Sequence, residues 1–128
     1  MDKRKRGLEW CKQVANYLKT EGHIIDGPFS KVIFSKGRKM SSHVDIFGVF
    51  DLISSKEGVI LFHQVTALNI LSNKRKKILK LGMKGMIWCH CKINGRDGYR
   101  RFNIDPLNTW GVWNRNRKTF WETSSVIL

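Results

Sequence analysis

Two stretches rich in β-branched and aromatic residues, separated by a short polar segment, constrain this chain most. The first runs from Val44 to Ile53 and the second from Val59 to Thr66, with Ser-Ser-Lys-Glu-Gly between them. Such runs bounded by turn-forming residues are typical of paired β-strands. The sequence therefore predicts a β-hairpin with a turn near Glu57.

The register of this hairpin follows from the alternation of side chains along a strand. Pairing the runs about the predicted turn places Asp51 opposite Gln64 and Val49 opposite Thr66. This pairing leaves one face almost wholly apolar and gathers the polar side chains on the other. A slip by one residue would set the face of Asp51 beside the apolar Val65, so we favour the first register.

The chain carries a large excess of positive charge. It has 24 Lys and Arg residues against 10 Asp and Glu residues, a formal net charge of +14. The segment from Gly58 to Arg96 contains eight basic residues and no acidic residue. Such an excess attracts polyanions, and solubility alone needs less of it. Nucleic acid is therefore the predicted partner, with a solubilising surface charge as the alternative.

Length and cysteine content indicate a single intracellular domain. A chain of 128 residues is long enough to bury one hydrophobic core. No apolar run approaches the roughly 20 residues that span a bilayer, so no membrane partner is expected. Residues 1–6 form a basic arm without the apolar segment of a signal peptide. The three cysteines provide no disulfide framework, which favours a reducing, cytoplasmic setting.

Further helices and strands surround the hairpin. The expected elements are a helix over 7–21, a strand over 31–34, a basic loop over 35–42, the hairpin, a helix over 72–81 and strands over 85–93 and 99–104. Gly22 and Gly82 suit the ends of the two helices, and Ser72 or Asn73 suits the start of the second. Together they predict one α/β domain spanning 1–128, with a central mixed β-sheet flanked by helices.

Basic residues cluster in two of these segments, the loop over 35–42 and the second helix. The helix has no interspersed acid, which favours phosphate contacts over a merely solvated face. The candidate DNA-binding residues are Lys36, Arg38, Lys39, Lys74, Arg75, Lys76 and Lys80. The tail over 107–128 is rich in Trp and Arg, and it either covers bound DNA or closes the core.

Two histidines invite other interpretations. Cys89-His90-Cys91 resembles a metal-binding cluster, but alternation along a strand sends His90 to the face opposite both cysteines, and no second pair is present. We therefore do not expect structural zinc. His63 falls beside apolar residues of the predicted hairpin, and we interpret it as a core histidine whose polar atoms are satisfied.

The first helix and the hairpin together resemble the PD-(D/E)XK nuclease superfamily, and within it the small archaeal and viral Holliday junction resolvases. In that layout a helical Glu precedes an Asp on one strand and an acid-x-Lys motif on the next. Asp51 falls at the Asp, thirteen positions before Gln64, and Gln64-Val65-Thr66 falls at the acid-x-Lys motif. Glu9 falls at the helical Glu.

The chain departs from the family motif at two positions, since Gln64 replaces the acid and Thr66 replaces the lysine. Lysines of this superfamily can come from a neighbouring helix, which makes Lys77 the candidate, with Lys74 and Lys80 as substitutes. The resemblance implies a restriction-endonuclease-like fold and cleavage of four-way DNA junctions. It also implies a homodimer, because two strands must be cut symmetrically.

The chemistry of phosphodiester hydrolysis supports a metal site on the hairpin. Mg²⁺ or Mn²⁺ takes oxygen ligands and keeps several waters, so few protein ligands suffice. Asp51 offers a carboxylate, Gln64 an amide oxygen and Val65 a backbone carbonyl. Asp45 lies roughly 20 Å from Asp51 along a straight strand. It can join the site only if Gly48 marks a bend.

Three functions remain open from the sequence. The first is a metal-dependent, structure-selective DNA endonuclease. The second is a non-catalytic DNA-binding protein on the same fold, which the Gln-x-Thr replacement favours. The third is a basic RNA-binding or ribosome-associated protein, which applies if the hairpin register is wrong.

Overall fold

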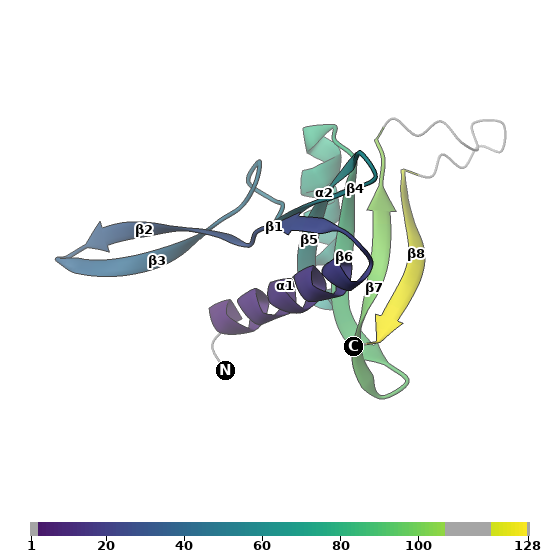
Figure 1. Cartoon of the computed structure of the whole chain (residues 1–128), viewed down its shortest axis with the longest axis horizontal. Coiled ribbons are helices and arrows are strands. Elements are labelled where there is room, and N and C mark those ends of the chain that lie inside the picture. The colour runs from purple at the N-terminus through teal and green to yellow at the C-terminus, as the bar shows by residue number, and fades with distance from the viewer. Residues whose placement is uncertain (1–2, 107–118, 128) are drawn as a thin grey trace.

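The computed structural model describes residues 3–106 and 119–127 of the chain. In chain order the elements are α1 (Lys3–Thr20), β1 (Ile24–Asp26), β2 (Phe29–Ser35), β3 (Arg38–Val44), β4 (Leu52–Lys56), β5 (Val59–Ala67), the 3₁₀ helix η1 (Leu68–Ile70), α2 (Leu71–Leu81), β6 (Gly85–Ile93), β7 (Arg96–Ile104) and β8 (Phe120–Ile127). Figure 1 shows their arrangement.

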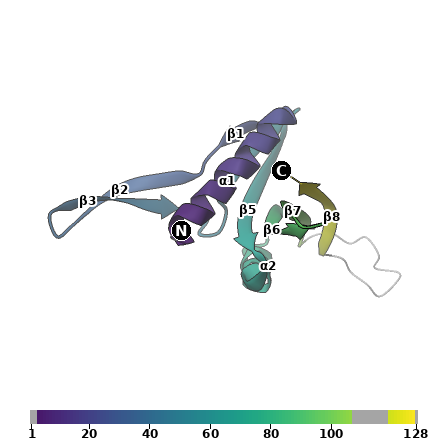
Figure 2. The same cartoon turned by 90° about the horizontal axis from the view of Figure 1, so that it is seen from below.

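Six of the strands form one mixed sheet, in the order β1-β4-β5-β6-β7-β8. Neighbours in this sheet are antiparallel except β5 and β6, which run parallel and are joined through η1 and α2. β2 and β3 form a separate two-stranded sheet that extends away from the body (Figures 1 and 2). The prediction of a single α/β domain with a mixed sheet is confirmed.

Each face of the large sheet is covered by one helix, so the core has two layers. The layer under α1 contains Cys11, Val14, Leu18, Leu52, Val65, Trp88 and Tyr99. The layer under α2 contains Val49, Phe50, Ile78, Ile87, Cys89, Phe102 and Ile104. Because side chains alternate along a strand, the central strand β5 sends Val65 into the first layer and its neighbour Gln64 towards the second. The second half of β5 is therefore buried on both faces.

The helices end as their glycines predict but do not begin as predicted. Gly82 takes the left-handed conformation with φ +71° at the end of α2, as expected of a helix-stopping glycine. α2 begins at Leu71 directly from η1, and no side chain caps its first turn. The predicted cap at Ser72 or Asn73 is therefore wrong. α1 begins at Lys3, so most of the basic segment 1–6 is helical and not an arm. No helix among the described residues is long and apolar enough to cross a bilayer.

The β4–β5 hairpin has the predicted register, on a shorter first strand. Leu52 pairs with His63 and Ile53 with Phe62, about a turn at Glu57. Continuing this register by one position sets Asp51 against Gln64. The prediction that the first strand begins at Val44 is wrong, because β4 begins only at Leu52.

A tight bend precedes β4 and explains its late start. The Ile46 backbone N–H donates to the Phe50 carbonyl at 2.7 Å, and these two residues form an isolated antiparallel bridge. Phe47 and Gly48 have φ values of +54° and +76°, in the left-handed region that glycine adopts readily. Val49 therefore lies in the bend and does not pair with Thr66, which corrects the prediction for that pair.

The segment predicted as a basic loop over 35–42 is instead the end of a β-hairpin. β2 and β3 pair from Phe29 with Val44 to Ser35 with Arg38. Between them, Lys36 and Gly37 have φ values of +52° and +74°, as in the two-residue turns that join antiparallel strands.

The last described strand, β8, closes the sheet at its other edge. β8 pairs with β7, the Phe120 ring stacks on Phe102 at a centroid distance of 4.9 Å, and Val126 is buried. For residues 120–127 the tail therefore closes the core. The Trp and Arg residues of 107–118 lie outside the described residues. β6 has the predicted bounds, and β7 begins at Arg96 instead of residue 99.

Candidate metal centre and nucleic-acid surface

Asp51 lies where the chain enters the large sheet. Its backbone N–H donates to the His63 carbonyl at 2.8 Å. Its carboxylate Oδ2 accepts the backbone N–H of Val65, also at 2.8 Å. Asp51 thus bonds to β5 just before β4 begins at Leu52, and its side chain takes the place of a backbone partner for the Val65 N–H. Asp51 is only 6% exposed, so its carboxylate is held in one place inside the fold.

Gln64 turns towards the same backbone segment. Its Nε2 donates to the Val65 carbonyl at 2.8 Å, while its Oε1 is buried without a hydrogen-bond partner among the described residues. The opposite amide orientation would set two acceptors against each other, so the atom without a partner is the oxygen. A buried acceptor left without a donor costs about 1–3 kcal/mol. A cation at this point would remove that cost.

Asp51 and Gln64 therefore both bond to the Val65 backbone, the Asp51 carboxylate at its N–H and the Gln64 Nε2 at its carbonyl. The N–H and C=O of one residue in a strand face the same side, so the Val65 carbonyl faces the side from which the Asp51 carboxylate approaches. Mg²⁺ and Mn²⁺ prefer such carboxylate, amide and carbonyl oxygens. Over 3–106 and 119–127 no group of three or more His, Cys, Asp or Glu side chains could hold a metal. A cation here would depend on the amide and the backbone carbonyl, and the donor set fits one.

The bend before β4 returns Asp45 towards Asp51. The two residues flank the Ile46–Phe50 bridge, whereas a straight strand would separate them. Burial raises the pKa of the Cys11 thiol, and the charges of Asp51 and Asp45 raise it further, so both carboxylates lie within electrostatic reach of one side chain. The bend that the sequence required for Asp45 to join the site is present.

Glu9, the helical acid that the resemblance implies, lies on the exposed side of α1. It is exposed on α1, two residues before the buried Cys11, and two residues correspond to about 200° around a helix. Glu9 therefore lies outside the buried stripe of α1 that includes Cys11. Glu9 lines a cavity of about 590 Å³ instead, together with Arg6, Trp10, Gln13, Ala67, His90 and Asp97.

Aromatic rings form one wall of this cavity, a feature that the sequence did not reveal. The Trp10 ring stacks on His90 at 4.2 Å between centroids, and the Arg6 guanidinium lies 5.5 Å from the Trp10 ring. His90 therefore faces α1, whereas Cys89 is buried in the layer under α2. The predicted separation of His90 from Cys89 is confirmed. Burial also raises the pKa of the Cys89 thiol to about 11.

A buried threonine stands where the sequence resemblance would place a lysine. Thr66 is 3% exposed, and its hydroxyl donates to the Ala67 carbonyl at 3.4 Å. Among the lysines of α2, Lys77 is exposed, whereas Lys74 is half-buried one turn before the buried Ile78. Lys74 therefore lies nearer the sheet-facing side of the helix than Lys77.

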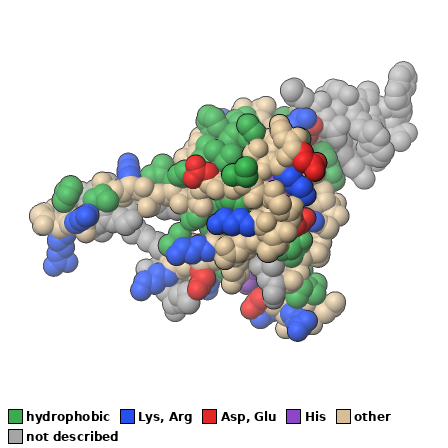
Figure 3. All heavy atoms as spheres, viewed as in Figure 1, with side chains coloured by type: hydrophobic (Ala, Val, Ile, Leu, Met, Phe, Trp, Pro, Cys, Tyr) green, Lys and Arg blue, Asp and Glu red, His purple; other side chains and the backbone are tan. Residues whose placement is uncertain are grey.

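The other basic residues of α2 divide into two groups. Arg75 is half-buried, and its guanidinium lies 5.1 Å from the centroid of the Phe120 ring, so it packs α2 against β8. Lys76 and Lys80 are exposed, as is Lys77. Lys36, Arg38 and Lys39 are exposed at the end of the β2–β3 hairpin, where Figure 3 shows Lys and Arg side chains along the extension.

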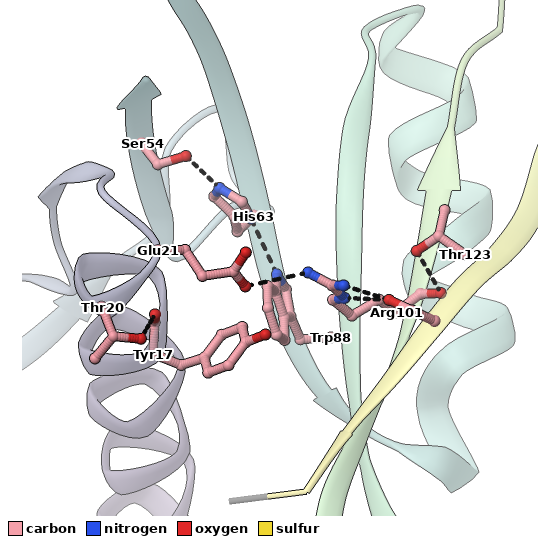
Figure 4. Close-up of polar contacts among 9 residues, drawn as sticks. Tyr17, Thr20, Glu21, Ser54, His63, Trp88, Arg101 and Thr123 are labelled. Atoms are coloured by element: carbon pink, nitrogen blue, oxygen red, sulfur yellow. Dashed lines mark hydrogen bonds and ion pairs between the residues drawn. The ribbon is translucent and has the colours of Figure 1, made fainter. Parts of the chain in front are cut away.

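His63 belongs to a buried hydrogen-bond chain (Figure 4). The Trp88 Nε1–H donates to His63 Nδ1 at 3.0 Å, and His63 Nε2 lies 2.7 Å from the Ser54 hydroxyl oxygen. Because an indole nitrogen only donates, Nδ1 is the acceptor and Nε2 carries the proton that is donated to Ser54. Burial lowers the pKa of His63 to about 3, with smaller contributions from His23 and Arg101. The interpretation of His63 as a satisfied core histidine is confirmed.

No protein-family model, curated protein or solved structure matches this chain. Three features of the described residues point to a function: the buried Gln64 oxygen, the bend before β4 and the extended β2–β3 hairpin. Of these, only the bend had a signal in the sequence, the glycine at position 48.

Proposed function

We propose that this chain is a metal-dependent DNA endonuclease of the Holliday-junction-resolvase type, acting as a homodimer. Asp51, Gln64 and the Val65 carbonyl would hold Mg²⁺ or Mn²⁺. The observation that carries the proposal is the buried Gln64 Oε1, which has no hydrogen-bond partner among the described residues and lies beside the Val65 carbonyl. When bound, a divalent cation supplies Lewis-acid stabilisation of the phosphoryl charge and an activated water.

The order of the elements supports this proposal. α1 precedes two antiparallel strands, Asp51 directly precedes the first of them, and Gln64 lies on the second. The order of helix, Asp51 and Gln64 supports the resemblance, whereas the strands β1, β2 and β3 between α1 and Asp51 are not part of the layout that it implies. A basic helix, α2, then follows the second strand and crosses to β6.

The roles of the protein side chains follow from their environments. The Val65 N–H fixes the Asp51 carboxylate, and burial strengthens its attraction to a cation because the local dielectric is low. Asp45, half-buried beside the bend, adds negative charge near the site. Lys74 is the lysine of α2 that we assign to stabilising the attacking hydroxide. The exposed lysines of α2 would contact DNA phosphates.

Cleavage assays with four-way and linear DNA test the proposal directly. We expect cleavage with Mg²⁺ or Mn²⁺, none with chelator, and faster cleavage of the four-way junction. Asp51→Asn should abolish cleavage and keep DNA affinity within a few fold, because the asparagine oxygen can still accept the Val65 N–H. Glu57→Gln, at the other end of the same hairpin, is the matched control. Undiminished cleavage by Asp51→Asn would remove the site from the mechanism.

A second candidate is a non-catalytic DNA-binding protein on the same fold. The observation that favours it is the buried Thr66 at the lysine position, together with the use of the Asp51 carboxylate as a partner for a backbone N–H. In that case the wild-type protein binds four-way and linear DNA equally well with metal and with chelator. It cleaves neither under any metal condition.

A further inference from the structure

The β2–β3 hairpin is a separate arm. It forms its own two-stranded sheet of seven residue pairs, and both views show it extending away from the large sheet (Figures 1 and 2). Seven residues of strand span roughly 23 Å. That length exceeds the roughly 12 Å width of the DNA major groove, which admits a two-stranded β-ribbon.

The arm carries charge of one sign. Residues 29–44 contain no Asp or Glu. Their Lys and Arg side chains are all exposed: Lys31, Lys36, Arg38 and Lys39. Because cations on both strands and the turn are exposed, an anionic partner could contact the arm along its length.

Apolar side chains are also exposed on the arm. Phe34 is 77% exposed and Val32 is 54% exposed. Phe34 pairs with Lys39 across the two strands, so an aromatic ring and an ammonium group share one face near the turn. A two-stranded hairpin is marginally stable by itself in water, and a partner that covers these side chains would stabilise it. Aromatic side chains in such a setting stack on nucleic-acid bases or insert between them.

The charge of the arm decides between possible partners. A second copy of this chain also has a net charge of +14, so the four exposed cations of the arm would repel it. Duplex DNA offers phosphates for the cations and bases for Phe34, so it complements both features of the arm.

We propose that the β2–β3 hairpin is a nucleic-acid-binding arm that lies in a groove of duplex DNA, with its Lys and Arg side chains on phosphates and Phe34 against the bases. This inference rests on DNA as the ligand in the proposed function, and it does not require cleavage. The chain continues from the end of β3 through Asp45 to Asp51. The position of the arm on the duplex would therefore determine which phosphodiester reaches Asp51.

Titrations of the full-length protein with duplex DNA, in chelator and over a range of NaCl concentrations, test this arm. The arm variant is Lys36→Ala/Arg38→Ala/Lys39→Ala. Its control is Lys12→Ala/Lys19→Ala/Arg96→Ala, which removes three exposed cations that lie outside the arm and α2. Loss of three phosphate contacts should reduce the slope of log affinity against log salt by about 2.7. An arm variant with wild-type affinity and slope would overturn the proposal, as would a wild-type protein that binds no DNA.

Phe34→Ser tests the base contact separately, with Ile60→Ser as a control because Ile60 is also largely exposed, at 62%. Loss of one stacked base lowers affinity roughly 5- to 150-fold, and the salt slope should not change. Wild-type protein should also change the fluorescence of 2-aminopurine in the duplex, and Phe34→Ser should not. A Phe34→Ser protein that binds normally but changes its sedimentation mass would overturn the proposal in favour of a second copy as partner.

These outcomes separate the arm from the proposed cleavage. Arm-dependent binding without cleavage under any metal condition would leave the arm in place and remove the nuclease. Metal-dependent cleavage, together with wild-type DNA binding by the triple-alanine arm variant and by Phe34→Ser, would keep the nuclease and overturn the arm. Circular dichroism and urea unfolding of each variant should match the wild type, because the substituted side chains are exposed.

Discussion

At the scale of single residues, the amide at position 64 is the most informative departure from the nuclease motif. A carboxylate there would face the Val65 carbonyl at the distance now occupied by a hydrogen bond, 2.8 Å from Nε2. Without a cation, that arrangement would set buried acceptors against one another near the Asp51 carboxylate. A glutamine avoids this repulsion, because its Nε2 satisfies the carbonyl. It leaves only Oε1 for a ligand.

This reasoning predicts opposite effects of Gln64→Glu with and without metal. In chelator the variant should unfold at a lower temperature than the wild type, because a buried carboxylate replaces a hydrogen-bond donor. Mn²⁺ should restore the unfolding temperature and bind the free variant more tightly than the wild type, as measured by calorimetric titration. Less Mg²⁺ should then suffice for half-maximal cleavage.

Gln13→Glu is the matched control for this change. Gln13 is an exposed residue of α1 whose Oε1 accepts the Tyr99 hydroxyl at 2.6 Å, and a carboxylate can accept the same bond. Its unfolding temperature should not depend on Mn²⁺. If Gln64→Glu gains no metal affinity, the Gln64 oxygen does not contribute to a cation site.

His63 should make the fold sensitive to mild acid. An unfolded histidine titrates near pH 6.5, whereas His63 in the fold has a pKa of about 3. Between these values only the unfolded state takes up the proton, so stability is complete above pH 6.5 and falls as the pH drops. We expect a loss of about 2 kcal/mol between pH 6.5 and pH 5 in urea unfolding. His63→Gln should remove this part of the pH dependence, and an equally steep loss in the variant would assign it to other groups.

At the scale of elements, β8 and α2 stabilise each other through one aromatic residue. Phe120 stacks on Phe102 of β7 and receives the Arg75 guanidinium of α2 on its ring. The end of the chain is therefore part of the sheet and of the layer under α2. Arg75 is therefore half-buried and is not among the fully exposed basic side chains of α2.

Phe120→Ala should therefore reduce stability without reducing DNA affinity. Removing a half-buried aromatic ring should cost roughly 2 kcal/mol, less than the loss from a fully buried one. Urea unfolding measures the first effect and DNA titration under folded conditions measures the second. A variant of normal stability and weakened DNA binding would instead place Phe120 in the nucleic-acid surface.

At the scale of the whole molecule, the net charge of +14 opposes the compact state. Ion pairs offset this only slightly, because those such as Arg100–Glu122 and Lys92–Asp97 lie near the surface, where solvent and salt screen them. The same charge would attract DNA. Stability of the free protein and affinity for DNA should therefore respond to salt in opposite directions.

Raising NaCl from low to physiological concentration should shift the urea midpoint of the free protein upward while it weakens DNA binding. The reason for both changes is screening, which reduces repulsion within the protein and attraction to phosphates. Unfolding and binding titrations over the same salt series measure them. A midpoint that falls with salt would mean that the ion pairs outweigh the net repulsion.

Local patterns in the sequence determined several elements of this protein. The alternation on both sides of Glu57 fixes the β4–β5 register, since any slip would exchange the two faces of the strand. A glycine able to adopt the left-handed conformation fixes the end of α2. These features depend on residues close together in the sequence, so a single chain is enough to predict them.

Only the tertiary structure decided what surrounds Asp51. Its carboxylate meets the Val65 N–H because β4 begins late, and β4 begins late because the chain bends between Ile46 and Phe50. The burial of Gln64 depends on α2 packing over β5, and the exposure of Phe34 depends on the arm lying away from both helices. Burial and hydrogen bonding between distant segments are set by how the whole chain packs, and residue types at one position do not specify them.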